Sequence, residues 1–457
     1  MRTDTICAVE VSPETREFIR MHRTDDVRDL ALHAKAGDGV DLPTALEQID
    51  GWQRARVKLP DWADRDGIIY PPHISMEQCS SQTTALYKAS VARRLMDTTT
   101  DTHADTGPAT GNAAVPATTL IDLTGGFGVD FSYMARSFSH GVYVERQANL
   151  CRIAEHNMAA LGLENVTIVN ADAESYLDDT SMAEPNATAE PNASAAPNAT
   201  TTPGSTLIFL DPARRDAHGS RTYAIADCAP DVISLESRLL DRAATAMVKL
   251  SPMLDWHKAI QDLGGPGIVR EVHIVSAGNE CKELLIVLQR SVSEQAGIRM
   301  YCVNDGDVID YTIGETEGND VDQTNDVDTG APADCRYVYE PNASIMKAGC
   351  FPLIERRYGV RRIGPNSHLF VSADPVDGFP GRGFAIIGTT GMNKRELRAA
   401  LADITHANIT VRNFPMPVAA LRRKLRVKDG GDITIFATTT AEGRHILLIA
   451  KRITSSD

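Results

Sequence analysis

The sequence lacks the features of a membrane or secreted protein. It contains no run of about 18 apolar residues, so we expect no membrane-spanning helix. The first residues, MRTDTICAVEVSPETREF, are charged and have no apolar core, so we expect no signal peptide. The eight cysteines include no CxxC pair, which argues against a zinc site or a disulfide framework and for a reducing compartment. We therefore expect a cytoplasmic protein without a metal site or a membrane partner.

Positive charge is scarce outside one region. The 457 residues carry a net charge of −15. Residues 336–457 contain 19 Lys and Arg against 10 Asp and Glu, whereas the remainder of the chain has a net charge of −24. A basic third on an acidic body suggests that the C-terminal third has a binding role of its own.

Three stretches have few large apolar residues. They are 97–117, 183–205, which repeats Pro-Asn-Ala, and the acidic stretch 315–334. None can bury enough surface to offset the entropy lost on ordering. We interpret the first two as surface insertions and the third as an interdomain linker within a connecting segment, 291–335.

Residues 1–95 are expected to be helical. REFIRMH, VRDLALHA and PTALEQIDGWQRARV place apolar residues three and four positions apart. A further helix with the body TTALYKASVARRLM follows EQCSSQ, and Ser80 or Ser81 is its expected N-cap.

Residues 118–290 have the pattern of an α/β domain. The β-rich runs TTLIDLT, GVYVE, VTIVNAD, TLIFLDP and TAMVKLSP alternate with helical patterns, which predicts a parallel sheet with helices on both faces. EVHIVSAG and CKELLIVLQR are separated by a break at Asn279-Glu280, which predicts a hairpin. The expected sheet has seven strands with the last one reversed, the layout of class I methyltransferases. The dinucleotide-binding sheet of dehydrogenases is normally all parallel.

Residues 336–457 are expected to form a separate α+β domain. Its predicted strands are GFAIIGTT, NITVRNF, DITIFATT and RHILLIAKR. Its predicted helices are NKRELRAALADI and PVAALRRKLRVKD, the second starting at Pro417 and ending at Gly430-Gly431.

A glycine-rich turn, IDLTGGFGVD (121–130), follows the first strand of the α/β domain. Its glycines, at 125, 126 and 128, let the backbone approach a ligand closely. The fingerprint G-x-G-x-x-G is not met, because Phe131 occupies the position of the third glycine. A plain tight turn would also account for this motif on its own.

Acidic residues follow three successive strands. Asp122 lies in the glycine-rich turn, Glu145 ends the second strand, and Asp172 follows the third. An acid at the second tip can bind ribose hydroxyls, and one at the third can accept from the adenine amino group. Each residue alone is more often a helix cap or a solvated acid. Together at one sheet edge, they indicate NAD or S-adenosyl-L-methionine (SAM) as the ligand.

Asp211-Pro212 ends the fourth strand, next to the topological switch point where ligands of open α/β sheets bind. Methyl transfer from a sulfonium requires alignment of nucleophile, methyl group and sulfur, and exclusion of water. The Asp211 carboxylate and the carbonyl groups after Pro212 can accept hydrogen bonds from an amino nucleophile and orient its lone pair.

In this order and spacing, DLTGGFGVD, VER, NAD and DPARRD resemble the motifs of SAM-dependent class I methyltransferases. The chain is more closely similar to bacterial methyltransferases with a THUMP-like C-terminal domain, over nearly its whole length except the three apolar-poor stretches. The shared stretches are KLPDW, EQCSSQTTALYKA, KLSPMLD, SAGNECKELL, YEPNASIMKAG and VRNFPMPVAALRRKL. DLTGGFG followed by Glu-Arg is also similar, more distantly, to a ribosomal RNA guanine-N2 methyltransferase family.

The resemblance implies SAM as cofactor and a site on the α/β domain. Ser80 and Ser81 would close the methionine end from a helix N-terminus, which suits a carboxylate, although both are equally consistent with simple helix caps. Asp211, Pro212 and Arg214 would be the catalytic residues. The other expected cofactor-binding residues are Asp122, Thr124, Gly125, Gly126, Gly128, Asp130, Glu145, Arg146 and Asp172.

Ala213-Arg214-Arg215 departs from the pattern of many nucleic-acid amino-methyltransferases, in which an aromatic ring after Asp-Pro stacks on the flipped base. The next aromatic residue is Tyr223, which disfavours the usual adenine-N6 or cytosine-N4 chemistry. Carbon-5 methylation requires a cysteine nucleophile, and we expect none near Asp211. The two arginines could hold a phosphate or stack on a base, or form ion pairs with Asp216, Asp130 or Glu145.

The C-terminal domain supplies candidate RNA contacts. LRRKLRVK contains Arg422, Arg423, Lys424 and Arg426, and ERRYGVRR contributes Arg356, Arg357, Arg361 and Arg362. A solvated helix face would have the same composition, but the basic excess is confined to one domain, and THUMP-type domains bind RNA. Such a patch gives affinity for phosphates without sequence choice.

Our leading hypothesis is a SAM-dependent methyltransferase of structured RNA, transfer or ribosomal, acting on a base amine, with guanine favoured. One alternative is a methyltransferase for a small molecule or protein. Another is a non-catalytic RNA-binding protein that senses SAM. An NAD oxidoreductase is disfavoured by the missing third glycine and the terminal hairpin.

Overall fold

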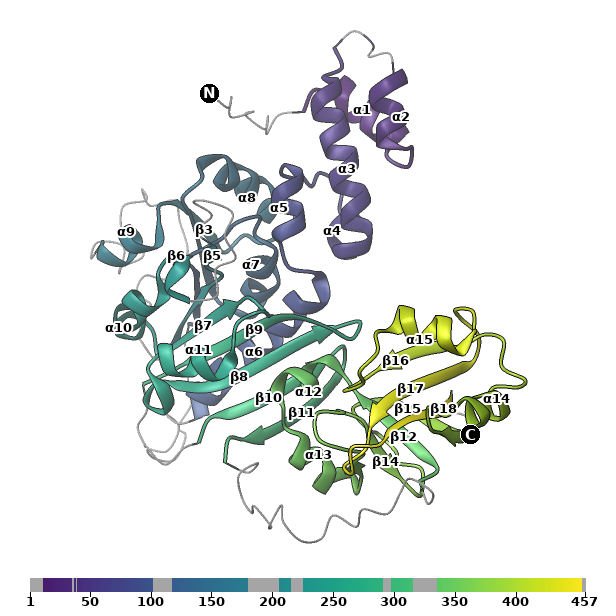
Figure 1. The fold of residues 1–457 in the computed structure, drawn as a ribbon. Coiled ribbons are helices and arrows are strands. Elements are labelled where there is room, and N and C mark those ends of the chain that lie inside the picture. The colour runs from purple at the N-terminus through teal and green to yellow at the C-terminus, as the bar shows by residue number, and fades with distance from the viewer. Residues whose placement is uncertain are drawn as a thin grey trace, which may run out of the picture. The chain divides into compact units, whose positions relative to one another are not determined.

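The computed structural model describes residues 11–34, 37, 39–101, 117–179, 205–214, 225–290, 297–314 and 335–453. Residues 102–116 and 183–204 of the two predicted insertions and the whole acidic stretch 315–334 lie outside these residues, as do Arg215, Asp216 and Tyr223. Residues 97–101, which we assigned to the first insertion, instead continue the preceding helix. The chain divides into two compact units: Met1–Val272 with Lys282–Ala296, and His273–Cys281 with Gly297–Asp457. Figure 1 shows their helices and strands.

The first unit begins with helices, as predicted. Phe18, Leu30, Ala45 and Ile49 form a small core between the first three of them. The Ser81 hydroxyl accepts a hydrogen bond of 3.3 Å from the amide of Thr84, so Ser81 is the N-cap of the last helix. The helices are α1 (Pro13–His22), α2 (Val27–His33), α3 (Leu42–Lys58), α4 (Pro60–Ala63), α5 (His73–Gln78) and α6 (Gln82–Asp101).

The strands of the first unit follow the order β8-β9-β7-β4-β1-β2-β3, but they belong to a sheet of nine strands and not of the seven that we expected, because β10 and β11 extend it beyond β8. The pairs on either side of β1 are parallel, as is β4 with β7, whereas β9 runs antiparallel to β7. The reversed last strand is therefore confirmed. The strands are β1 (Thr119–Asp122), β2 (His140–Glu145), β3 (Val166–Asn170), β4 (Thr206–Leu210), β7 (Thr245–Leu250), β8 (Val269–Ala277) and β9 (Glu280–Leu288).

Both faces of this sheet are buried. Leu207 and Phe209 of β4 belong to a core that includes residues of α6, α7 and α8, whereas Ile208 and Leu210 point to the opposite face and are also buried. The two-residue turn between β8 and β9 is Gly278-Asn279, both with positive φ, one residue before the predicted break. The connecting helices are α7 (Val129–Met134), α8 (Ala148–Ala160), α9 (Ala173–Asp178), α10 (Val232–Arg242) and α11 (Trp256–Asp262).

The second unit starts earlier than the domain that we expected at 336–457. Strands β10 (Arg299–Asn304) and β11 (Asp307–Thr312) pair in a hairpin inside the segment predicted to be a connection. The sequence contained a signal for it, since Asp305-Gly306 lies between alternating apolar residues. Beside β10 lies the part of β8 that belongs to this unit.

The rest of the second unit is built on a sheet with the order β13-β14-β12-β15-β18-β17-β16. Helices α14 and α15 pack on the same face of it, because Leu397, Leu421 and Leu425 share one core with Ile435 and Leu447. The elements are β12 (Tyr337–Pro341), α12 (Ala343–Ala348), α13 (Phe351–Tyr358), β13 (Arg361–Arg362), β14 (Phe370–Ser372), β15 (Gly381–Thr390), α14 (Lys394–Ala400), β16 (Asn408–Val411), α15 (Val418–Leu425), β17 (Ile433–Thr439) and β18 (His445–Arg452).

The predicted end of α15 at Gly430-Gly431 is wrong. The helix ends at Leu425, because Arg426 adopts a left-handed conformation with φ 61° and its amide bonds to the carbonyl of Arg422 at 2.9 Å. An arginine thus occupies a position that usually favours glycine. In the part of the chain that the structure describes, no helix is both long and apolar enough to cross a membrane.

Candidate active site

The carboxyl ends of β1, β2, β4 and β7 and the residues after β3 surround a cavity of about 790 Å³ in the first unit. That volume is typical of a small-molecule site. Ser81, which caps α6, is not among the lining residues, and the side chain of Arg214 is not described. The predicted residues that line the cavity are Ser80, Asp122, Thr124, Gly125, Gly126, Gly128, Asp130, Glu145, Arg146, Asp172, Asp211 and Pro212.

The glycine-rich turn is shaped both by protein packing and by the cavity. A Cβ atom on Gly125 would lie 2.2 Å from the ring of Tyr143, so no larger residue fits there. The Tyr143 hydroxyl donates a hydrogen bond of 2.5 Å to the carbonyl of Gly126. Gly126 has φ +57°, and a Cβ there would meet no side chain within 4 Å. The space beside the Cα atom of Gly126 therefore lets a ligand approach, although the amide and carbonyl of this residue bond to Glu145 and Tyr143. Gly125, in contrast, is required by Tyr143.

The carboxyl group of Asp122 is buried and 2% exposed. Its Oδ1 accepts a hydrogen bond of 2.9 Å from the amide of Thr124. The pKa of Asp122 is raised to about 8, chiefly by burial. The carboxylates of Asp130 and Asp211 also raise this pKa, whereas the hydrogen bond from Thr124 lowers it. A substantial fraction of Asp122 is therefore protonated at neutral pH.

Glu145 and Asp172 are held in different ways. Glu145 is buried, and its two oxygens accept from the amides of Gly126 at 2.9 Å and Gln147 at 2.8 Å. These bonds fix the carboxylate and leave further lone pairs for a ligand. Asp172 accepts from the amide of Ser175 at 2.7 Å as the N-cap of α9, and this bond lowers its pKa. Asp172 thus has the simple cap role and lines the cavity as well.

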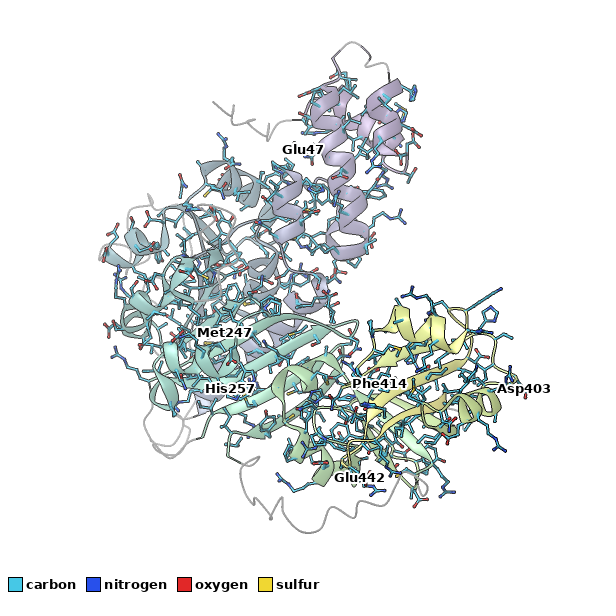
Figure 2. The ribbon with its side chains drawn as sticks, in the orientation of Figure 1. Glu47, Met247, His257, Asp403, Phe414 and Glu442 are labelled. Atoms are coloured by element: carbon cyan, nitrogen blue, oxygen red, sulfur yellow. The ribbon has the colours of Figure 1, made fainter. Side chains whose placement is uncertain are left out.

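Three charged residues at this site were missed from the sequence: Lys88, Lys249 and Glu283. The ammonium of Lys88 is fully buried and lies 2.7 Å from Glu283 and 3.2 Å from Asp130. Lys249 Nζ lies 2.6 Å from Asp211 Oδ2. Met247, labelled in Figure 2, lies two residues earlier on the same strand. All three missed residues fall in the stretches shared with the THUMP-like methyltransferases, which was the only signal for them.

Ser80 connects these charged groups. Its hydroxyl donates to Asp130 Oδ2 at 2.7 Å and accepts from Lys88 and Lys249, each at 3.2 Å. Ser80 is therefore part of the polar network of the cavity and does not serve as the helix cap.

The expectation that no cysteine lies near Asp211 is wrong. Residues 213–214 form the short strand β5, which pairs with β6 (Cys228–Ala229). Cys228 and Cys79 both line the cavity. Burial raises the pKa of Cys79, which disfavours its reactive thiolate form.

No aromatic ring among the described lining residues is free to stack on a flat substrate. Phe127 and Phe209 line the cavity but are 5% and 1% exposed. Even without the partly protonated Asp122, the acids Asp130, Glu145, Asp172, Glu174 and Asp211 outnumber the bases Arg146, Lys249 and Lys282 in this lining. Such a surplus of carboxylates suits a cationic ligand better than the pyrophosphate of NAD.

The predicted RNA contacts of the second unit divide into two kinds. Arg422 is engaged in the fold, since it donates to the carbonyl of Ala407 at 2.9 Å and pairs with Asp429 at 2.5 Å. Arg423, Lys424 and Arg426 are exposed. In ERRYGVRR, the internal contacts include those of Arg357 with the carbonyl of Asp310, Arg361 with the sulfur of Cys335, and Arg362 with Glu355.

Comparison with solved structures decides the fold. A proposed methyltransferase from Porphyromonas gingivalis W83 superposes with a TM-score of 0.75 and 29% sequence identity, over 96% of this chain and 98% of that one. This chain has the methyltransferase fold. The SAM-dependent methyltransferase from Agrobacterium tumefaciens matches over 44% of this chain and 61% of its own, with 12% identity and a TM-score of 0.28. That second likeness is too weak to carry an argument.

Family models match the second unit. Residues 381–452 match the THUMP domain-like family, and residues 337–380 match a ferredoxin-like domain. The predicted resemblance to a methyltransferase with a THUMP-like C-terminal domain is confirmed, although the THUMP-like match covers less than the predicted 336–457. No curated protein sequence matches the chain significantly.

Proposed function

We propose that the chain is a SAM-dependent methyltransferase that methylates a base amine of structured RNA. The observation that carries this proposal is the convergence of Asp122, Glu145, Asp172 and Asp211 on one acid-rich cavity at the carboxyl ends of the strands. The same arrangement on a methyltransferase fold supports methyl transfer over hydride transfer.

The residues of the cavity fit SAM. Its ribose hydroxyls would bind to Glu145, whose carboxylate is already oriented by the amides of Gly126 and Gln147. Asp172 would accept from the adenine amino group, and Arg146 also lines the cavity. The methionine end would lie against Ser80, which precedes α6, and against Thr124 and Asp130 of the glycine-rich turn. The carboxylate surplus would stabilise the two positive charges of the cofactor.

SAM supplies an electrophilic methyl group when it is bound. Asp211 accepts a hydrogen bond from the acceptor amine and directs the nitrogen lone pair at that methyl group. Bound SAM would supply the methyl group as its carbon–sulfur bond breaks and the new nitrogen–carbon bond forms, and the methylated nitrogen would release one proton to solvent. No covalent bond to the protein is needed, so alignment and water exclusion account for the protein's contribution.

RNA is the substrate that the charge distribution favours. Arg423, Lys424 and Arg426 are exposed on α15 and its end, in the THUMP-like part of the chain. Guanine is our preferred base, because none of the lining residues that the structure describes offers an exposed ring of the kind that adenine and cytosine amino-methyltransferases use.

The substrate test compares RNA from a wild-type and a deletion strain by nucleoside mass spectrometry. We expect one methylated guanosine to be missing from transfer or ribosomal RNA of the deletion strain, and purified protein with radiolabelled SAM to restore it. An unchanged set of nucleosides would contradict the RNA assignment. Calorimetry with SAM and with NAD then tests the cofactor separately, and binding of NAD alone would contradict the enzyme class.

A further inference from the structure

The carboxylate of Asp211 is in contact with a lysine that the sequence did not reveal. Lys249 Nζ donates to Asp211 Oδ2 at 2.6 Å. The contact follows from the sheet, because β4 and β7 are parallel neighbours with Leu210 opposite Val248, which places the next residues of both strands side by side. Two adjacent strand tips thus supply the acid and its cation.

Asp211 is fixed at two points. Its amide donates to the Thr124 hydroxyl at 2.6 Å, which holds the main chain, and the bond from Lys249 holds one carboxylate oxygen. Together these contacts define the rotation of the carboxylate and hence the place of Oδ1. The side chain of Asp211 remains 38% exposed at the cavity, so Oδ1 can accept from a substrate.

Lys249 is itself held from behind. Its side chain is 13% exposed, and its ammonium also donates to the Ser80 hydroxyl at 3.2 Å and lies 3.9 Å from Asp130. Burial would lower the pKa of Lys249, but the carboxylates of Asp211 and Asp130 outweigh burial and raise it. The lysine therefore stays charged and cannot act as a base.

We propose that Lys249 is the positioning residue for Asp211: it locks the carboxylate so that Oδ1 faces the acceptor amine. This inference rests on the proposed methyl transfer at Asp211. Lys88 cannot replace Lys249, because Lys88 pairs with Glu283 and Asp130.

The test compares Lys249→Met, Asp211→Asn and the double variant, using radiolabelled SAM and total RNA from the deletion strain. We expect Lys249→Met to lower kcat by about 100-fold, the loss expected from a slightly misplaced reacting group. The dissociation constant of SAM, measured by calorimetry, should change by less than about threefold, because Ser80 and Asp130, the proposed cofactor residues near Lys249, are also held by each other and by Lys88. Lys249→Gln, which keeps a hydrogen-bond donor, should restore part of kcat.

The double variant separates positioning from a general structural role. If Lys249 acts through Asp211, adding Lys249→Met to Asp211→Asn should cost no further activity. Additive losses, or a Lys249→Met enzyme with wild-type kcat, would overturn the proposal. Lys258→Met is the matched control, since Lys258 pairs with Asp262 on the surface of α11, and its kcat should be unchanged.

A second measurement does not depend on activity. Urea unfolding of the wild type, Lys249→Met, Asp211→Asn and the double variant measures the coupling between Lys249 and Asp211 in the folded state. If the wild type methylates no RNA, the RNA proposal fails, but non-additive unfolding free energies would still support Lys249 as the residue that holds Asp211. Additive unfolding free energies would overturn the positioning role whatever the substrate is.

Discussion

The carboxyl group of Asp122 shows how one residue in the cavity is set by its surroundings. It lies at the end of β1, 2% exposed, with Asp130 and Asp211 close enough to raise its pKa further. Glu145, at the neighbouring strand tip, is also buried, but it accepts two backbone amide hydrogen bonds. The two acids therefore differ in their hydrogen-bond partners, and each has its own test.

Asp122 should make the stability of the protein depend on pH. Its folded pKa of about 8 lies above the ordinary value of 3.8, so the folded state binds the proton more tightly than the unfolded state. That contribution is fully present below about pH 4 and is lost as the pH rises towards 8. We expect the free energy of unfolding of Asp122→Asn to fall less than that of the wild type as the pH rises from about 4 to 8. Urea unfolding at a series of pH values measures this difference. Parallel pH profiles would contradict the buried, protonated carboxyl.

Glu145 should control cofactor affinity. Glu145→Gln removes the charge that would bind two ribose hydroxyls, and hydrogen bonds to a charged group contribute about 1.5–3 kcal/mol. We expect SAM to bind roughly 10- to 100-fold more weakly in calorimetry. Glu155→Gln, on the exposed side of α8, is the matched control and should bind like the wild type. Unchanged affinity in Glu145→Gln would remove Glu145 from the proposed site.

Elements of the chain differ in how firmly local sequence sets their ends. The turn between β8 and β9 contains glycine and asparagine in left-handed conformations, and pattern alone located it within one residue. The end of α15 was misplaced by several residues, because an arginine there takes the left-handed conformation. The core contacts of Leu421 and Leu425 keep the helix in place despite that cost.

The left-handed arginine gives a stability prediction at the level of the helix. Arg426→Gly should stabilise the protein by about 0.5–1 kcal/mol, since glycine adopts this conformation without strain. Arg423→Gly, inside the same helix, should destabilise it by up to about 1 kcal/mol. Urea unfolding of both variants checks the difference in sign. Both changes remove one charge of the proposed RNA-binding patch, so RNA affinity should fall in both.

At the scale of the whole molecule, the two segments that match separate family models contribute strands to one sheet of the second unit. Glu340 on β12, in the ferredoxin-like match, is 4% exposed and pairs with Arg382 on β15 and with Arg412 after β16, both in the THUMP-like match. β12 and β15 are also antiparallel neighbours. These contacts make the two matched segments parts of one folded unit.

Removal of Glu340 should therefore weaken the whole second unit. Glu340→Ala leaves two guanidinium groups without their shared partner, and breaking such a buried pair costs about 3–5 kcal/mol, less here because both arginines are partly exposed. We expect the second unit to unfold at lower urea concentration in a single transition. Separate transitions of residues 337–380 and 381–452, followed by hydrogen exchange, would contradict a single unit.

Local pattern was sufficient for much of the architecture. Apolar spacing located α1, α2 and α3, the reversed β9 and the main strands of the second unit, because these elements bury one face with a regular period. Apolar spacing did not predict β10 and β11. The acidic stretch that follows them has few apolar residues, and we therefore assigned the whole segment 291–335 to a connection. Strand ends also located Asp122, Glu145, Asp172 and Asp211, because the carboxyl ends of parallel strands meet at one edge.

By itself, the sequence determined the class of fold, the reversed last strand and the acids at the strand tips, because each depends on residues that are close together in the chain. Only the tertiary structure decided which charges meet. Lys88 pairs with Glu283 across 195 positions, and Lys249 reaches Asp211 across 38. No local sequence pattern predicts such ion pairs, because the order of the strands in the sheet determines which residues meet. The fixed carboxylate of Asp211 follows from its contact with Lys249, and the raised pKa of Asp122 follows from its burial in the fold.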